Sequence, residues 1–225
     1  MERNIKVIAK IKTDFKTKFG IPRQSGLCNS EALVVFEPEY QKEEAFRGIE
    51  GFSHLWLIWE FSEAVKEDWS PTVRPPRLGG NKKMGVFATR SPFRPNPIGL
   101  SSVKLIGVEK IDGQIALRVS GADLMDGTPI YDIKPYLAYT DAHIDAVGGF
   151  TDDSKDNFIN VVCDDELLNK IPSEKQKPLL EVLKQDPRPR YIDDEQRVYG
   201  FVFADYEIKF RVQNDLLTVI DIYKV

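Results

Sequence analysis

The stretch GLSSVKLIGVEKIDGQIALRVS, residues 99–120, decides the fold of this chain. Two runs rich in β-branched and aliphatic residues, 99–110 and 114–120, flank Asp112 and Gly113. Asp-Gly between two such runs is the typical sequence of a tight turn that joins antiparallel strands. The stretch therefore predicts a β-hairpin in the middle of a β-rich region.

Further strands are predicted on both sides of this hairpin. Residues 5–11 alternate apolar and charged side chains, and residues 32–36 form a short apolar run. The segment FSHLWLIWEF, residues 52–61, is apolar nearly throughout, which favours a strand covered on both faces. Residues 128–137 close the region. Short strands and loops rich in Gly and Pro, without long amphipathic helices between them, favour an antiparallel barrel or sandwich over a parallel sheet.

A change in composition divides the chain. Residues 141–156 are acidic and small, which is typical of a linker. Beyond them we expect a strand at residues 158–162, a helix at 173–184 with Ser173 and Gln176 at capping-box spacing, and two strands around Asn214 and Asp215. The predicted fold is mainly β: a small antiparallel β-barrel domain, residues 1–143, followed by a small α+β domain, residues 144–225.

Composition limits the kind of protein. The 225 residues include 42% hydrophobic residues, enough for a packed core. No apolar run approaches the roughly 20 residues that cross a bilayer, and the N-terminus lacks the apolar block of a signal peptide, so we expect a cytoplasmic protein without a membrane span. Two cysteines and two histidines, all far apart, favour neither disulfides nor a metal site, and we predict no metal.

The segment GVFATRSPFRPNPIGLS, residues 85–101, is the first candidate site. Its three prolines stiffen a non-helical loop that carries Arg90, Arg94 and Asn96. Residues 69–108 contain seven Lys or Arg and no Asp or Glu, in a chain of net charge −4, as expected of a local site for an anionic partner. A solvated surface turn, or a Pro-x-x-Pro ligand for an SH3-like domain, is the alternative.

Two more polar turns are candidates. Residues 22–27 (PRQSGL) form a rigid turn after the first strand, and residues 123–132 (DLMDGTPIYD) carry three carboxylates and a tight turn at Asp126. A plain connector and an Asx-turn are the simpler interpretations of the two. The chain has no Rossmann or P-loop glycine pattern and no G-x-S-x-G sequence, which disfavours covalent serine catalysis.

Five blocks of sequence, in this order, resemble the TsaA-like (YaeB, VirR, TrmO) family. The blocks are PRQSGL (22–27), SHLWLIWEF (53–61), PTVRPPRLGGN (71–81), GVFATRSPFRPNPIGLS (85–101) and DGTPIYDIKPYL (126–137). The C-terminal part is similar to the second domain of bacterial members, through DPRPRY (186–191) and YGF (199–201). One departure is Ser62, where some members of the family have a histidine, so no role of that histidine is transferred.

The resemblance implies an S-adenosylmethionine-dependent tRNA methyltransferase. Its expected reaction is methylation of N6 of threonylcarbamoyladenosine (t6A) at position 37, next to the anticodon. A TsaA-like β-barrel would hold S-adenosyl-L-methionine, and the enzyme would act as a homodimer with the cofactor near the subunit interface. The partners are thus the tRNA anticodon stem-loop and a second copy of the chain. A rival function is a barrel that binds S-adenosylmethionine or a nucleotide and regulates a partner without turnover.

The resemblance also assigns site residues by position. The cofactor site would comprise Pro22, Arg23, Gln24, Glu60, Phe61, Arg90, Leu100, Leu124, Asp126, Gly127 and Thr128. As hypotheses, Arg90 binds the carboxylate end of the cofactor or a nearby phosphate, and the turn at residues 124–128 binds its adenine. Asp126 is the candidate catalytic carboxylate. Substrate phosphates and the anticodon loop would meet Arg74, Arg77, Lys82, Lys83, Arg94 and Asn96, with Phe87, Phe93 or Trp69 available for base stacking.

Overall fold

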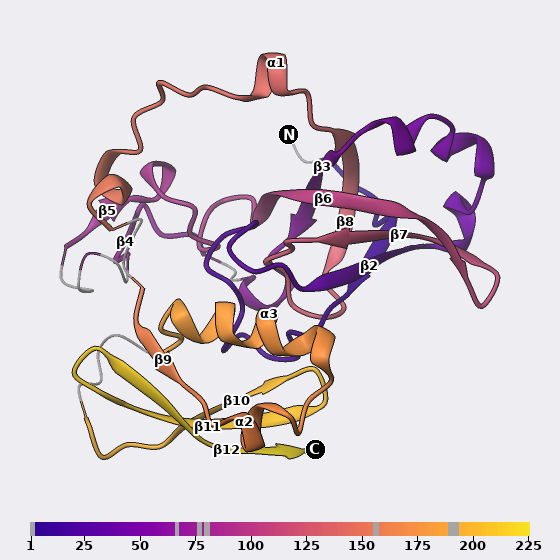
Figure 1. Cartoon of the computed structure of the whole chain (residues 1–225). Coiled ribbons are helices and arrows are strands. Elements are labelled where there is room, and N and C mark those ends of the chain that lie inside the picture. Colours follow the sequence, from indigo (N-terminus) through magenta and orange to yellow (C-terminus); the bar gives the residue numbers. More distant parts are fainter. Residues whose placement is uncertain (1–2, 66–67, 76–77, 79–81, 155–157, 189–193) are drawn as a thin grey trace.

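Six antiparallel strands close into a barrel in the first half of the chain (Figure 1). The structure is a computed structural model, and it describes residues 3–65, 68–75, 78, 82–154, 158–188 and 194–225. The barrel strands, in spatial order, are β1 (Ala9–Lys12), β2 (Glu31–Phe36), β7 (Gln114–Ser120), β6 (Ile98–Ile111), β3 (His54–Glu60) and β8 (Pro129–Pro135), with β8 pairing back onto β1.

The predicted hairpin is confirmed. β6 and β7 pair up to Ile111 and Gln114, and both Asp112 and Gly113 have positive φ, the geometry of the tight turn that an Asp-Gly pair favours. The first half of β6 pairs with β3 and its second half with β7, with a bulge between Leu105 and Gly107. Because a bulge bends a strand, this long strand can follow the curve of the barrel.

Two predictions about the barrel strands are wrong in detail. The first strand covers only Ala9–Lys12, and Ile5 is 57% exposed, so the alternation of residues 5–8 does not reflect a strand. The aromatic strand β3 is buried on one face only: Leu55, Leu57 and Trp59 point into the core, and the residues between them are half-buried. The strand predicted at residues 128–137 is β8.

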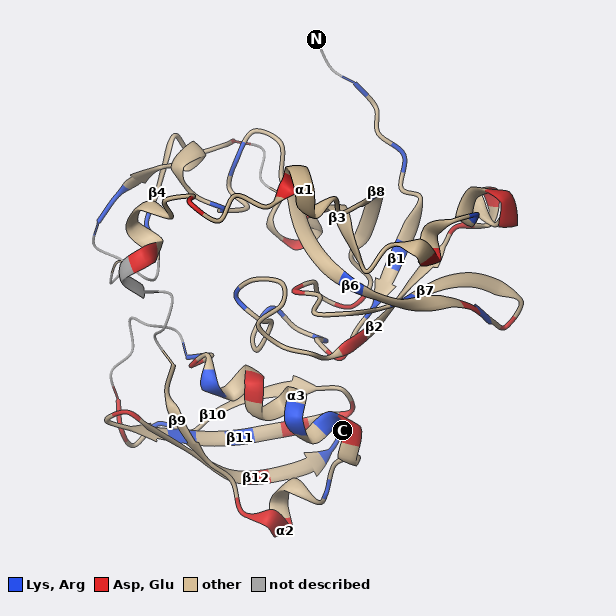
Figure 2. Cartoon of the chain, turned by 45° about the horizontal axis from the view of Figure 1, so that its top comes forward, with Lys and Arg blue, Asp and Glu red and all other residues tan. Residues whose placement is uncertain are grey.

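The C-terminal part is a four-stranded sheet with helices. Its strand order is β10 (Tyr199–Phe203), β11 (Tyr206–Gln213), β12 (Leu216–Lys224) and β9 (Asn160–Val162), with β9 parallel to β12. α3 (Ser173–Lys184) matches the predicted helix and lies between this sheet and the barrel, whereas α2 (Asp165–Leu168) lies at the far side (Figures 1 and 2).

Two predictions for this part are wrong. The helix begins after Pro172 without a side-chain cap, and Gln176 Nε2 instead donates to the carbonyl of Ile171 over 3.3 Å, so no capping box forms. The tail has three strands rather than two, because a further turn at Ala204, with a φ of 52°, separates β10 from β11. Asp205 is a common turn residue, but the positive φ falls on Ala204, which does not favour it.

A segment from the N-terminal half packs on the C-terminal sheet. After β1 the chain leaves the barrel, and Phe15 and Cys28 are buried in the core formed by α3 and the sheet. Phe15 bridges to Phe203, and their ring centroids are 5.9 Å apart. The barrel has a separate core. Thus residues between β1 and β2 join the two halves, while the boundary expected at residues 143 and 144 stays a prediction.

A short two-stranded ribbon lies beside the barrel. β4 (Thr72–Val73) pairs with β5 (Met84–Gly85), and a 3₁₀ turn, η6 (Val86–Ala88), follows at once. After α1 (Ala138–Asp141) the chain reaches a further 3₁₀ turn, η7 (Gly149–Ser154), near this ribbon (Figure 1). No helix in the described part of the chain is long and apolar enough to cross a bilayer.

Candidate functional site

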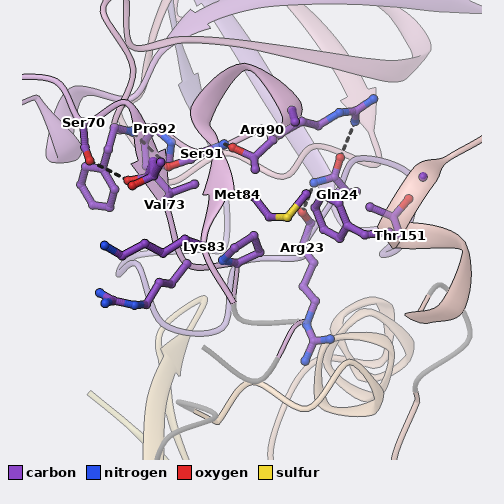
Figure 3. A pocket seen from close by; sticks show the side chains of 18 of the residues that line it. Arg23, Gln24, Ser70, Val73, Lys83, Met84, Arg90, Ser91, Pro92 and Thr151 are labelled. Atoms are coloured by element: carbon purple, nitrogen blue, oxygen red, sulfur yellow. Dashed lines mark hydrogen bonds between the residues drawn. The ribbon is translucent and has the colours of Figure 1, made fainter. Parts of the chain in front are cut away.

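A large groove opens between the ribbon, the first polar turn and the C-terminal part (Figure 3). Its volume is about 1680 Å³, larger than the roughly 300–1,000 Å³ of pockets for a small ligand. The groove has room for more than one small molecule. Four segments line it: residues 18–24, residues 68–93 in part, residues 147–151, and Asp186 to Arg188.

The groove is basic. Its charged lining residues comprise six cations, Lys18, Arg23, Arg74, Lys83, Arg90 and Arg188, and two acids, Asp68 and Asp186. Figure 2 shows Lys and Arg on the loops around β4. Arg188 pairs with Asp186, Nε to Oδ1, over 2.8 Å. Although burial raises it, the pKa of Asp186 lies below its usual value because of the hydrogen bonds and charge of Arg188. The lining therefore keeps an excess of positive charge toward a ligand.

Arg90 and Gln24 meet at this groove, as the sequence predicts for two cofactor residues. A guanidinium nitrogen of Arg90 donates a hydrogen bond to Gln24 Oε1, and Gln24 Nε2 donates to the carbonyl of Arg23 over 2.5 Å. Figure 3 shows Arg23 pointing away from this contact, and its Nη2 donates to the carbonyl of Asp186 over 2.8 Å. Pro22 is buried behind the turn. The turn at residues 22–27 is thus fixed on one side by the proline-containing loop of residues 85–101, here called the proline loop, and on the other side by the C-terminal part.

The proline loop is anchored at its base. The N–H of Phe61 donates to the carbonyl of Pro97 over 2.8 Å, and Arg94 Nη1 donates to the carbonyl of Thr89 over 3.2 Å. At the start of the loop Val86, 1% exposed, is buried, whereas the next residue, Phe87, is 73% exposed. The loop keeps Arg94 folded against its own backbone, while Asn96 is exposed.

A buried carboxyl connects the predicted cofactor segments, and sequence reasoning did not single it out. The Ser101 hydroxyl donates to Asp123 Oδ1 over 2.5 Å, and Trp59 Nε1 donates to Ser101 Oγ over 3.0 Å. The backbone of Ser25 and the charge of Arg90 also act on Asp123. Each of these residues adjoins or belongs to a predicted cofactor segment, so one hydrogen-bonded cluster joins segments far apart in the chain.

The pKa of Asp123 reflects this position. Burial raises the pKa of the carboxyl above its ordinary value, against the opposing effects of the Ser101 hydroxyl, two backbone N–H groups and Arg90. The sequence signal was weak, because Asp123 is one of three acids within residues 123–132 and nothing distinguishes it from Asp126 before the fold is known.

Asp126 is held by the end of β1. Its Oδ1 accepts the N–H of Thr13 over 2.9 Å, and its Oδ2 accepts Lys16 Nζ over 3.0 Å. The backbone N–H groups of Asp126, Gly127 and Thr128 donate to Phe15, Ile11 and Met125. Leu124 is fully buried. This turn does not line the groove, and its predicted roles in binding and catalysis stay predictions.

The remaining predicted cofactor residues lie on the barrel outside the groove. Phe61 packs on Trp59, with ring centroids 4.3 Å apart. Burial, with the neighbouring Glu60 carboxylate, raises the pKa of Tyr131 to about 12. Leu100 is 56% exposed on β6. In one copy of the chain, Glu60, Phe61 and Leu100 therefore do not face Arg23, Gln24 and Arg90 across the groove.

Of the residues predicted to contact substrate phosphates, only some line the groove. Arg74 and Lys83 lie at the same end of the β4–β5 ribbon, next to the paired residues Val73 and Met84, and both line the groove. No ion pair of theirs occurs among the described residues. Lys82 is exposed next to Lys83. Arg77 lies outside the described residues. In the part of the chain that is described, no three His, Cys, Asp or Glu side chains gather in a way that could hold a metal ion.

Known proteins similar to this chain share its architecture. The family described as the tRNA-methyltransferase O N-terminal domain matches residues 10–142, and the TrmO C-terminal domain matches residues 159–225. The chain is 42% identical to the tRNA (adenine(37)-N6)-methyltransferase of Escherichia coli over 215 residues, 91% of each chain. It is 45% identical to the enzyme of that name from Eikenella corrodens over 168 residues, 75% of this chain and 95% of that one.

A solved structure is similar over the whole length. The crystal structure of TrmO from Pseudomonas aeruginosa superposes with a TM-score of 0.79 at 33% identity, covering 100% of this chain and 98% of that chain. A Methanothermobacter thermautotrophicus relative, 38% identical over 66% of this chain and 97% of its own, is described as a probable S-adenosyl-L-methionine-binding protein. With its barrel, its C-terminal sheet and both family domains in order, the chain belongs to the tRNA-methyltransferase O family.

Proposed function

We propose that this chain is an S-adenosylmethionine-dependent methyltransferase that methylates N6 of adenine 37 in tRNA. The observation that carries the proposal is the basic groove, in which Arg23, Gln24 and Arg90 of the predicted cofactor site lie beside Arg74 and Lys83 of the predicted phosphate site. Relatives named for this reaction cover nearly the whole chain. A site for a small charged cofactor next to a site for a polyanion is what such a reaction requires.

The substrate base is proposed to be the threonylcarbamoyl form, t6A. Its side group ends in a carboxylate, so a base with this group is bulkier and more anionic than adenine. The volume of about 1680 Å³ and the cations that line it support such a substrate. An anionic group gains most from a site whose positive charges are not already neutralised by acids.

The residues present fit S-adenosyl-L-methionine. The Arg90 guanidinium, held by Gln24, offers donors for the cofactor's carboxylate, which an arginine binds through paired hydrogen bonds. The charges of Asp123 and Arg90 also attract each other, which favours the charged form of Asp123. Glu60, Phe61, Leu100 and the turn at residues 124–128 would complete the site. When bound, the cofactor supplies the methyl group for N6.

Positioning is the main contribution that the protein's residues can make. Methyl transfer between two held groups is accelerated when both are fixed in line, because the entropy of alignment is lost on binding. The prolines and the anchoring bonds of residues 85–101 provide a stiff wall for this purpose. A residue that accepts the proton of N6 must lie within hydrogen-bond reach of it. The sequence makes Asp126 a candidate, although both of its carboxylate oxygens already accept hydrogen bonds from Thr13 and Lys16.

A homodimer would unite the divided site. Leu100 and Ile106, 56% and 46% exposed, lie on the outer side of β6, and Leu100 belongs to the predicted cofactor site. A second copy that covers β6 would bury these side chains and bring Leu100 next to the groove residues of its partner. We propose this arrangement, with the cofactor near the interface, for an enzyme that acts on tRNA in the cytoplasm.

A methylation assay tests the proposal. The protein is incubated with S-adenosylmethionine carrying a labelled methyl group and with tRNA that holds t6A but lacks the methyl group, and the nucleosides are separated by mass spectrometry. We expect labelled N6-methyl-t6A, and unmodified transcripts show whether the threonylcarbamoyl group is needed. Binding of S-adenosylmethionine without any labelled nucleoside would overturn the proposal and favour a regulatory barrel without turnover.

A further inference from the structure

Two aromatic side chains stack on each other at the rim of the groove. The ring centroids of Trp69 and Phe87 are 6.1 Å apart at an interplanar angle of 27°. Yet Phe87 is 73% exposed and Trp69 49% exposed, so each ring keeps much of its surface in solvent. Exposure of apolar surface to water is unfavourable in free energy. An exposed aromatic pair beside a groove is therefore a place where a flat ligand group can bind by covering the rings.

The backbone beneath these rings is well tied. The N–H of Val86 donates to the carbonyl of Pro71 over 3.0 Å, and Ser70 Oγ donates to the carbonyl of Thr72 over 2.6 Å. Val86, next to Phe87, is buried. The Val86–Pro71 bond ties the start of β4 to the end of β5 at one end of the ribbon, so Trp69 and Phe87 are presented together beside it.

The charge around the pair identifies the occupant. Phe87 lines the groove together with Arg74 and Lys83 of the same ribbon, and Lys18, Arg23 and Arg90 lie on its other sides. Stacked aromatic faces with cations spaced along the same groove are the general arrangement for single-stranded nucleic acid, because every base has a π-face and every linkage a phosphate. An apolar protein segment would not need this density of positive charge.

We propose that Trp69 and Phe87 form a stacking platform for an unpaired base of the RNA loop bound in this groove. The proposal rests on the proposed function for its RNA substrate and adds the side chains that hold a splayed-out base. Single-stranded loops are recognised by such stacking, because their bases are free to leave the helix. Arg74 and Lys83, together at the other end of the same ribbon, would then hold phosphates next to the stacked base.

Binding of an RNA hairpin tests the platform directly. The probe is a hairpin with an unpaired loop of anticodon sequence, and a fully paired duplex of the same length is the comparison. We expect Phe87→Ala to weaken hairpin binding about 5- to 150-fold and to change duplex binding little, while Phe87→Tyr keeps the affinity. Phe158→Ala is the matched control, because Phe158 is 56% exposed before β9 and does not line the groove.

Charge and stacking are separable by salt. Lys83→Ala should weaken binding of hairpin and duplex alike and reduce the slope of log affinity against log salt by about 1. Phe87→Ala should leave that slope unchanged, because no charge is lost. A fall in slope for Phe87→Ala equal to that for Lys83→Ala would overturn the stacking role.

Tryptophan fluorescence gives a second measurement. The other two tryptophans, Trp56 and Trp59, lie on β3 and are hydrogen-bonded to Asp141 and Ser101 respectively. Both are present in the wild type and in Trp69→Phe, so the difference in emission between the two proteins isolates Trp69. We expect the hairpin, and not the duplex, to quench this emission. Unchanged emission, with hairpin binding of Phe87→Ala equal to that of the wild type and an unchanged Tm, would overturn the platform.

The outcomes separate the two proposals. If the hairpin quenches Trp69 and no methyl group is transferred in any tRNA, the platform stands and the proposed function fails. If Phe87→Ala methylates tRNA with wild-type kcat/KM, the platform is wrong and the proposed function stands. Conversion of a dimer to a monomer by Phe87→Ala, with RNA binding intact, would show that the rings cover a second copy and would also overturn the platform.

Discussion

The Ser101 hydroxyl donates a hydrogen bond of 2.5 Å to Asp123 Oδ1 at the point where the predicted cofactor segments meet. Burial raises the pKa of Asp123, so this carboxyl is charged at a cost in the folded protein. The folded chain binds more protons than the unfolded chain between the ordinary value of 3.8 and the raised one. The contribution of Asp123 to stability therefore falls as the pH rises through this interval.

Asp123→Asn should remove this dependence. The amide oxygen still accepts the Ser101 hydroxyl, and the variant carries no charge to bury, so we expect it to be at least as stable as the wild type near pH 7. Its advantage in Tm should shrink as the pH is lowered toward about 4, where the unfolded carboxyl is half protonated. Thermal melts of both proteins over this range measure the difference. An advantage that grows toward acid would contradict the raised pKa.

Arg90→Ala should weaken binding of S-adenosylmethionine. Loss of charge-assisted hydrogen bonds to a carboxylate is worth roughly 1.5–3 kcal/mol, or about 10- to 150-fold in Kd. Titration calorimetry measures the affinity. Arg47→Ala is the matched control, since Arg47 is exposed and lines a separate hollow beside residues 43–50. Equal Kd values for Arg90→Ala and the wild type would remove Arg90 from the cofactor site.

The variant Asp126→Asn tests whether Asp126 only stabilises its turn or also accepts the proton of N6. Asp126→Asn keeps an acceptor for the Thr13 N–H and loses only the ion pair with Lys16, a pair that is half-exposed and worth about 0–1 kcal/mol. We expect a small change in Tm and turnover within a few-fold of the wild type, because both oxygens are engaged by Thr13 and Lys16, just after β1. A loss of turnover of about 100-fold at unchanged Tm would instead establish Asp126 as the proton acceptor.

Local patterns predicted the elements of this fold well. Asp112 and Gly113 fix the β6–β7 hairpin through positive φ, and the leucines of residues 173–184 fix α3 by their spacing. Closure of the barrel is different, because it depends on β8 returning to β1 across more than a hundred residues. The turn between β10 and β11 was missed because its positive φ falls on Ala204, a residue that does not favour it.

The site could be predicted only in pieces. The stiffness of the proline loop and the cluster of positive charge are properties of consecutive residues, so the sequence could point to Arg90, Arg74 and Lys83, which line the groove. Arg23 meets the carbonyl of Asp186 across 163 positions of sequence, and no periodicity carries that contact. The importance of Asp123 depends on burial by Trp59, Ser101 and Ser25 from three other segments, which only the fold brings together.

The two cysteines should differ in reactivity. Burial raises the pKa of the Cys28 thiol to about 12, since it is fully enclosed between the N-terminal segment and α3, where Sγ donates to the carbonyl of Pro178 over 3.5 Å. Because the thiolate is the reactive form, we expect Cys28 to resist a disulfide reagent until the protein unfolds. Cys163 is less buried and should react first.

A Cys163→Ser variant isolates Cys28 in this measurement. The variant should show almost no thiol reaction in its native state and one thiol per chain in denaturant. Fast reaction of the native variant would mean that the segment between β1 and β2 separates readily from α3.

Gly20→Ala should damage the junction between the two halves. Gly20 has a φ of +88°, and a Cβ there would lie 2.3 Å from Cδ2 of Phe201, on a strand of the C-terminal sheet. A left-handed conformation costs an L-residue about 1–2 kcal/mol, and overpacking adds about 1–3 kcal/mol, so we expect a loss of roughly 2–5 kcal/mol in the free energy of unfolding. Gly51→Ala is the control, since nothing lies within 4 Å of a Cβ there.

Gly20 is itself part of the groove wall, so the same substitution should weaken RNA binding more than Gly51→Ala does. Equal denaturation midpoints for the two variants would show that the first turn moves freely against the sheet, and the groove would then not be held open by this contact.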